Sequence, residues 1–178
     1  MIYFAICDSQ DQFIKIGYTQ EDPQKRIFNL RTGNPNQIYC LFYVDGERSL
    51  EKRLHKIFKE QNHRKEWFKF EGFLEQFIVT IVDDAWERYC QIEYFNKCEE
   101  HIIEKYGQDV WDDFDSEPDD IELYEIQKNL DEKRDRYPNF NDMLEMSAYF
   151  DALKEPPDVL DFQFNHLVDE AEKFKEGK

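Results

Sequence analysis

The first part of the chain consists of short apolar runs separated by polar turns, a pattern that predicts β-strands. Apolar runs at residues 2–6 and 13–17 flank the polar segment 8–12, which predicts a β-hairpin. Residues 38–44 are β-branched or aromatic almost throughout, which is typical of a central strand buried on both faces. Residues 66–70 predict a further strand. We therefore expect a small antiparallel sheet of three to four strands.

Two helices are predicted between these strands. Pro23 favours a helix start, and residues 24–30 follow it before the Thr-Gly-Asn-Pro sequence at 32–35 ends the helix. Residues 50–60 carry an apolar stripe at helical spacing, and Ser49 is their expected N-cap. The sheet and its flanking helices together predict an α+β domain.

The apolar period becomes helical after this domain. A long helix is expected at residues 73–106, although its β-branched middle, residues 78–82, would by itself be read as a strand. An acidic linker at 109–120 follows. Further helical patterns lie at residues 121–137, 141–154 and 159–175. We therefore expect an α+β domain at residues 1–72 and an acidic, all-helical domain or extension at residues 73–178.

The net charge of -17 is distributed unevenly along the chain. Residues 1–72 hold 12 Lys and Arg against 10 Asp and Glu, a net charge of +2. Residues 73–178 hold 11 Lys and Arg against 30 Asp and Glu, a net charge of -19. Such asymmetry indicates two parts with different electrostatic roles. With 40% hydrophobic residues the chain is too apolar to be disordered.

Two further features of the sequence concern the location of the protein in the cell and the chemistry of its cysteines. No stretch approaches the roughly 20 apolar residues that span a bilayer, and the N-terminus predicts a strand without a basic leader. We expect a soluble, cytoplasmic protein with no membrane partner. The four cysteines, Cys7, Cys40, Cys90 and Cys98, lack the spacing of a zinc site. Buried thiols without a ligand are the favoured interpretation.

Residue types that suit phosphodiester chemistry are concentrated in the first domain. In chain order they are Tyr3, Lys15-Ile16-Gly17, Arg26, the segment 32–35, Glu51, His55 and Glu66-Trp67-Phe68. In this order and spacing the chain resembles the GIY-YIG nuclease superfamily, in the phage and bacterial branch whose second motif begins with lysine. The resemblance covers residues 1 to about 71. It implies a viral or bacterial origin, an antiparallel sheet flanked by helices, and phosphodiester hydrolysis with one divalent ion, Mg²⁺ or Mn²⁺.

The resemblance implies a role for each of four residues. Tyr3 matches the general base, and Lys15 on the paired strand is placed to lower its pKa. Arg26 matches the arginine directed at the scissile phosphate, and Glu51 matches the single carboxylate that binds the metal. These types suit the chemistry because a water must lose a proton, the transition state needs a cation and the leaving oxygen needs a Lewis acid.

Further candidates surround these four residues. His55 lies one helical turn after Glu51, so it either assists proton transfer, binds a phosphate or is structural. Additional contacts to nucleic acid are expected from Lys25, Arg31 and Asn34. DNA is the favoured substrate, and RNA remains open. Met1 stands where the first motif has glycine, and Asn62 is only an approximate counterpart of the asparagine that closes such domains.

Three functions remain in competition. The first is an active endonuclease that the acidic part at 73–178 restrains or targets. The second is an inactive interaction protein on the same scaffold, and the third is a DNA-mimic inhibitor that acts through the acidic helices, which also offer a surface for a protein partner. Within 109–120, carboxylates alternate with Trp111 and Phe114, which fits either a solvated linker or phosphate mimicry. The joint presence of all four catalytic and metal-binding candidates favours the nuclease.

Overall fold

The computed structural model describes residues 1–108, 121–154, 159 and 161–177. It divides into two compact units. The first comprises Met1–Asp83 and Pro138–Lys178, and the second comprises Asp84–Tyr137. The expected linker at 109–120, with its two aromatic residues, lies outside the described residues. The domain boundary expected after residue 72 marks the point where the apolar period of the sequence becomes helical, whereas the two units are defined by their compactness. That boundary therefore stays a prediction.

A five-stranded antiparallel sheet forms the centre of the first unit. The strands are β1 (Ile2–Cys7), β2 (Phe13–Tyr18), β3 (Ile38–Val44), β4 (Asn62–Arg64) and β5 (Trp67–Lys69), in the spatial order β3-β1-β2-β5-β4. The α+β class and the β1–β2 hairpin are confirmed, and Tyr3 lies opposite Gly17 in that hairpin. β4 gives the sheet one strand more than expected, because its three exposed residues, Asn-His-Arg, carry no apolar signal.

The central position expected for residues 38–44 is wrong, because β3 is an edge strand and β1 and β2 lie inside the sheet. The apolar side chains of β3 are nevertheless buried, including Ile38, Leu41 and Phe42. Helices on the first unit cover them, since both α1 (Pro23–Arg31) and α6 (Phe140–Leu153) pack against β3. Packing against these helices therefore explains the apolar character of residues 38–44, which we had expected to reflect a central position in the sheet.

The other helices lie close to the expected ranges. They are α2 (Arg48–Ile57), α3 (Gly72–Tyr106), α5 (Ile121–Arg134) and α7 (Asp161–Glu176), with a short 3₁₀ helix at Lys59–Gln61. Ser49 is not the N-cap of α2, because the helix begins one residue earlier and Glu47 precedes it. The β-branched segment 78–82 is helical, with Ile78 and Val82 fully buried. Within the described ranges, no helix is both long and apolar enough to span a bilayer.

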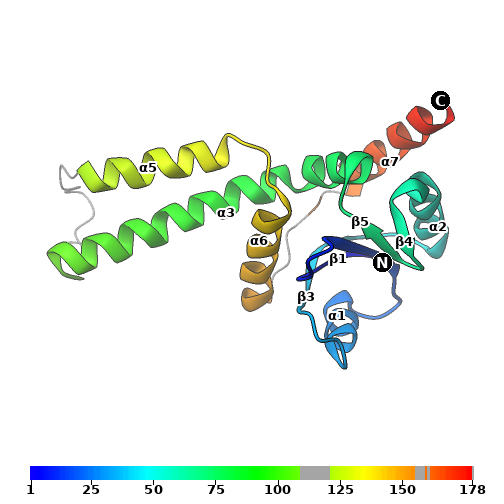
Figure 1. The fold of residues 1–178 in the computed structure, drawn as a ribbon, viewed down its shortest axis with the longest axis horizontal. Coiled ribbons are helices and arrows are strands. Elements are labelled where there is room, and N and C mark those ends of the chain that lie inside the picture. The colour runs from blue at the N-terminus through cyan, green and yellow to red at the C-terminus, as the bar shows by residue number, and fades with distance from the viewer. Residues whose placement is uncertain (109–120, 155–158, 160, 178) are drawn as a thin grey trace. The chain divides into compact units, whose positions relative to one another are not determined.

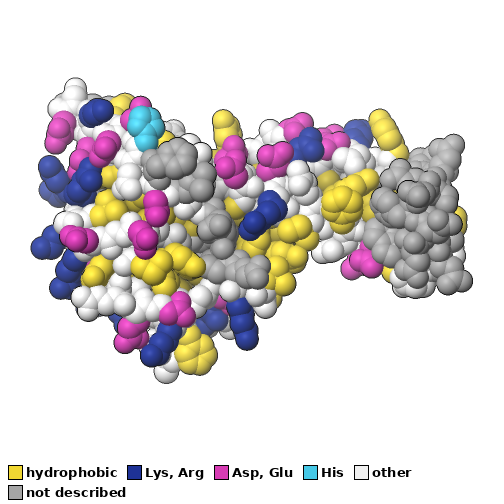
Figure 2. Space-filling model, turned by 180° about the vertical axis from the view of Figure 1, so that it is seen from behind, with side chains coloured by type: hydrophobic (Ala, Val, Ile, Leu, Met, Phe, Trp, Pro, Cys, Tyr) yellow, Lys and Arg dark blue, Asp and Glu magenta, His cyan; other side chains and the backbone are white. Residues whose placement is uncertain are grey.

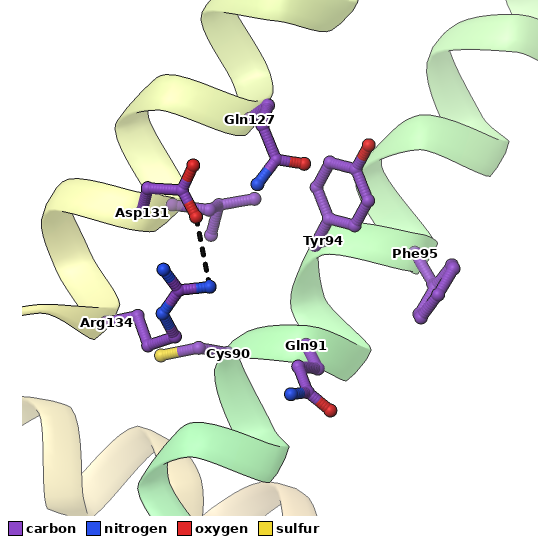
Figure 3. A pocket seen from close by; sticks show the side chains of 8 residues that line it. Cys90, Gln91, Tyr94, Phe95, Gln127, Asp131 and Arg134 are labelled. Atoms are coloured by element: carbon purple, nitrogen blue, oxygen red, sulfur yellow. Dashed lines mark ion pairs between the residues drawn. The ribbon is translucent and has the colours of Figure 1, made fainter.

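The second unit pairs the later turns of α3 with α5. Lys133 of α5 forms an ion pair of 2.8 Å with Glu93 of α3 and lies over the ring of Trp86 at 5.3 Å. A pocket of about 290 Å³ opens between the two helices. Figure 3 shows Asp131 and Arg134 at this pocket, paired with each other at 3.1 Å. The charged groups of this pocket are thus engaged with one another.

The alternation of side chains along the strands gives the sheet two different faces. On one face, Tyr3, Ala5 and Cys40 pack with Ile27 of α1. The opposite face is covered by α2, α7 and the first turns of α3, and Figure 1 shows α1 and the start of α3 on opposite sides of the sheet. Each face therefore presents its side chains to a different set of helices.

An aromatic cluster fills the core on the second face. The rings of Phe4 and Phe42 stack with centroids 4.4 Å apart. Phe164 of α7 lies edge-on to these two rings at 6.0 and 6.3 Å, and it also contacts Phe77 of α3 at 5.9 Å. Phe164 has no exposed surface. A helix from the acidic part of the chain therefore completes the core of the N-terminal sheet, and residues 1–72 alone lack part of that core.

We predict that Phe164→Ala destabilises the first unit by about 3–5 kcal/mol, because it removes a fully buried ring and leaves a cavity. Chemical denaturation of the full-length protein, followed by circular dichroism, measures this change. Phe28→Ala is the matched control, because Phe28 is 66% exposed, and it should have little effect. Equal stabilities of the two variants would contradict the packing described for α7.

Candidate active site

Tyr3 lies at the centre of the candidate site, on the sheet face that α1 covers. Its ring lies against the backbone of Gly17 on the paired strand, and a Cβ at position 17 would come within 2.5 Å of both Cζ and Oη of Tyr3. Side-chain carbon atoms do not approach other atoms this closely, so position 17 must be glycine while the ring stays in place. The Tyr3 side chain is almost entirely buried.

The acidity of Tyr3 is controlled mainly by burial. Burial raises the pKa of Tyr3 above its ordinary value, a hydrogen bond and the positive charge of Arg26 oppose this rise, and the charges of Glu66 and Glu51 add to it. Burial is the largest influence on this pKa and Arg26 is the cation that lowers it, so the part expected of Lys15 stays a prediction. Phenol, guanidinium and carboxylate are nevertheless close enough to influence one another.

Lys15 is paired with Glu66 instead. The lysine is buried, its ammonium lies 5.6 Å from the ring centroid of Trp67, and the Glu66 side chain is 43% exposed. Burial opposes ionisation of Glu66, but the hydrogen bond and charge of Lys15 outweigh it, and the pKa of Glu66 lies below its usual value. From the sequence alone, Glu66 was expected only as part of a motif. The β2–β5 pairing, with Lys15 opposite Trp67, brings it to the site.

Glu51 is a buried carboxylate near the N-terminus of α2, where the helix dipole favours negative charge. Its Oε1 accepts a hydrogen bond of 3.0 Å from the Tyr18 backbone N–H, and its Oε2 lies 3.9 Å from Nε of Arg48. Among the residues that the structure describes, no three His, Cys, Asp or Glu side chains gather around a common point. A lone carboxylate of this kind can hold Mg²⁺ or Mn²⁺ together with water and substrate oxygens, and metal binding by Glu51 stays a prediction.

His55 lies on the same helix and contacts the sheet. Its Nε2 is 3.0 Å from the carbonyl oxygen of Ile16, and its ring centroid is 5.0 Å from that of Phe68. A ring nitrogen that faces a carbonyl oxygen donates a hydrogen bond, so Nε2 carries a proton in this arrangement. The contact supports the structural interpretation of His55, and its part in proton transfer stays a prediction.

The three residues expected to bind nucleic acid differ in their existing contacts. Arg31 donates to Oδ1 of Asp151 at 2.7 Å, so α6 already holds this guanidinium. Asn34 accepts a hydrogen bond within its own turn at 3.0 Å. Lys25 is exposed and lies 3.6 Å from Glu21. Lys25 is thus the least constrained of the three, and all three roles stay predictions.

The four cysteines are all buried, as expected from the sequence. Burial raises the pKa of Cys40 to about 12 and also raises the pKa of Cys7. Both thiols are therefore protonated at neutral pH, which removes the thiolate that nucleophilic or metal chemistry needs.

Comparison with known proteins places the N-terminal part of the chain in a family. The sequence model of the T5orf172 domain matches residues 1–106 of the 178. This family is related to phage endonucleases, which suggests a nuclease-like domain that binds nucleic acid. The match continues past residue 72 to the last residue of α3. No curated protein and no solved structure matched the chain.

We predict that Gly17→Ala costs about 1–3 kcal/mol of stability, because the new methyl group overlaps the Tyr3 ring. The overlap should disappear when the ring is removed, so Gly17→Ala should cost much less in a Tyr3→Ala background. A double-mutant cycle measured by chemical denaturation gives this coupling directly. Additive effects of the two substitutions would contradict the contact.

Proposed function

Since the chain belongs to the T5orf172 domain family, we propose that it is a metal-dependent endonuclease of the GIY-YIG type that hydrolyses DNA. One observation carries the proposal: the Tyr3 ring lies against Gly17, and the backbone N–H of the next residue, Tyr18, donates a hydrogen bond to Glu51. The positive charge of Arg26 lowers the pKa of the same phenol, against the rise that burial causes. A base, a cation for the phosphate and a carboxylate for the metal are the groups that one-metal hydrolysis requires.

In this proposal Tyr3 takes the proton from the attacking water. Only the phenolate accepts a proton, and burial raises the pKa of Tyr3, so the phenolate is the minor form at neutral pH. Cleavage should therefore accelerate as the pH rises. Gly17 contributes by leaving space for the ring, which fixes the direction of the hydroxyl.

Arg26 is the proposed phosphate-binding residue. Arg26 is an exposed residue of α1, and its charge acts on both Tyr3 and Glu66. A planar guanidinium donates to two phosphoryl oxygens at once and stabilises the charge that develops in the transition state. We assign Lys15 a positioning role. Its hydrogen bond to Glu66 holds the ammonium and the carboxylate in place beside the Tyr3 phenol.

Glu51 is the proposed ligand of the divalent ion. The Tyr18 backbone N–H orients one carboxylate oxygen, and the other has only the distant Arg48 beside it. A bound Mg²⁺ or Mn²⁺ would supply Lewis-acid stabilisation of the leaving oxygen. His55, on the same face of α2, is a further candidate for proton transfer, although its bond to Ile16 ties it to the sheet.

The acidic helices are proposed to restrain the nuclease domain. Asp151 of α6 pairs with Arg31, while Asp169 and Glu172 of α7 pair with Arg53 of α2 at 2.7 and 2.8 Å. These carboxylates occupy two arginines of the N-terminal part that would otherwise attract phosphates. Restraint of this kind lowers the affinity for nucleic acid without any change in the catalytic residues.

We predict that Glu51→Gln reduces metal-dependent nicking of a supercoiled plasmid by at least about 100-fold, because the metal loses the carboxylate proposed to bind it. Glu47→Gln is the matched control, since Glu47 is exposed beside the same helix terminus and caps no N–H group. Thermal melting checks that both variants fold. Equal nicking by Glu51→Gln and wild type would place the metal elsewhere. A folded wild type that nicks with neither Mg²⁺ nor Mn²⁺ would favour the inactive interaction protein.

A further inference from the structure

Exposed cations line the outer side of α2 and continue to the β4–β5 turn. We call this set the cationic stripe, and its members are Arg48, Lys52, Lys56, Lys59, Arg64 and Lys65. Residues 48–69 hold eight Lys and Arg against three Asp and Glu, within a chain of net charge -17. Figure 2 shows Lys and Arg side chains gathered along the left-hand edge of the unit that contains the sheet.

Helix geometry explains why the three members of the stripe on α2 share one surface, and Lys59, Arg64 and Lys65 follow them along the chain. Leu50, Leu54 and Ile57 of α2 are buried against the first unit. Arg48, Lys52 and Lys56 recur at every fourth residue, so at about 100° per residue they lie within about 80° of one another on the opposite side. The side chains of Arg48 and Lys56 are 76% and 78% exposed.

The two sides of the cationic stripe are bordered by different residues. Glu51 and His55 lie on one border, towards β2 and the candidate active site. Arg53 lies on the other border, where Asp169 and Glu172 bind its guanidinium. The stripe therefore runs between the proposed metal ligand and the acidic surface of α7.

The cations of the stripe are only weakly neutralised by the protein. Lys52, Lys59, Arg64 and Lys65 form no ion pair within the described part of the chain. Arg48 lies 3.9 Å from Glu51, and Lys56 lies 4.0 Å from the exposed carboxylate of Glu176. The exposed Lys56–Glu176 pair contributes little at this distance, and Arg48 is largely exposed although its partner Glu51 is buried, so both cations remain accessible to a ligand.

We propose that the cationic stripe binds the phosphate backbone of a DNA duplex and brings it alongside Glu51. The inference rests on the proposed function and names the surface through which the substrate enters. Flexible lysine ammonium groups contact phosphates as point charges and read no bases, so this binding is independent of DNA sequence. The acidic surface of α7 repels phosphates, which confines the duplex to the border that carries Glu51.

The test measures binding of a fluorescein-labelled DNA duplex to the full-length protein in EDTA, by fluorescence anisotropy over a range of NaCl concentrations. The stripe variant carries Lys52→Gln, Lys56→Gln and Lys59→Gln. The control variant carries Lys97→Gln, Lys128→Gln and Lys173→Gln, three exposed lysines of α3, α5 and α7 that change the net charge equally. A second variant, Lys52→Glu, alters a single exposed side chain, so misfolding of the triple variant would not leave the question open.

The slope of log affinity against log salt should become shallower by about 2.7 in the stripe variant, since each phosphate contact contributes about 0.9. The control should keep the wild-type slope, and Lys52→Glu should weaken binding more than Lys97→Glu. Equal slopes for the stripe and control variants would overturn the inference while leaving the nuclease proposal intact. The salt slope could become shallower in the stripe variant while the wild type cuts no DNA in the presence of a metal. This result would support DNA binding by the stripe and contradict the proposed nuclease activity.

Discussion

The contact between the Tyr3 ring and the backbone of Gly17 is the constraint on which the candidate site depends. With no side chain at position 17, the ring lies against the strand, where the positive charge of Arg26 from α1 lowers the pKa of Tyr3. The same burial that holds the ring raises the pKa of Tyr3. Position and reactivity of the proposed base therefore have one physical origin, the close packing of β1 on β2 beneath α1.

The opposite face of the sheet holds the second half of the site in place. α2 packs against β2, and the Tyr18 N–H binds Glu51 across this interface. Phe164 of α7 completes the aromatic core on that face, so the acidic C-terminal helix is a structural part of the unit that carries the site. This placement explains how a chain of net charge -17 keeps a cationic surface, because the carboxylates of α7 are fixed along one border of α2.

Local patterns in the sequence predicted much of this structure. Two apolar runs separated by a polar turn predicted the hairpin that pairs Tyr3 with Gly17, and helical spacing predicted α2 and α3. Features that depend on distant residues were missed, because periodicity describes only the nearest neighbours along the chain. These features include the edge position of β3, the pairing of Lys15 with Glu66 across β2 and β5, and the burial of Phe164.

The pH dependence of DNA cleavage by the full-length protein tests the role of Tyr3 most directly. Below a raised pKa, the phenolate fraction increases about tenfold for each pH unit. Initial rates with Mg²⁺ should therefore rise about tenfold per unit between about pH 6 and about pH 8. The Tyr3→Phe variant, which keeps the ring but not the hydroxyl, should lose this dependence together with most of the activity. A wild-type rate that is independent of pH in this range would contradict the assignment of Tyr3 as the base.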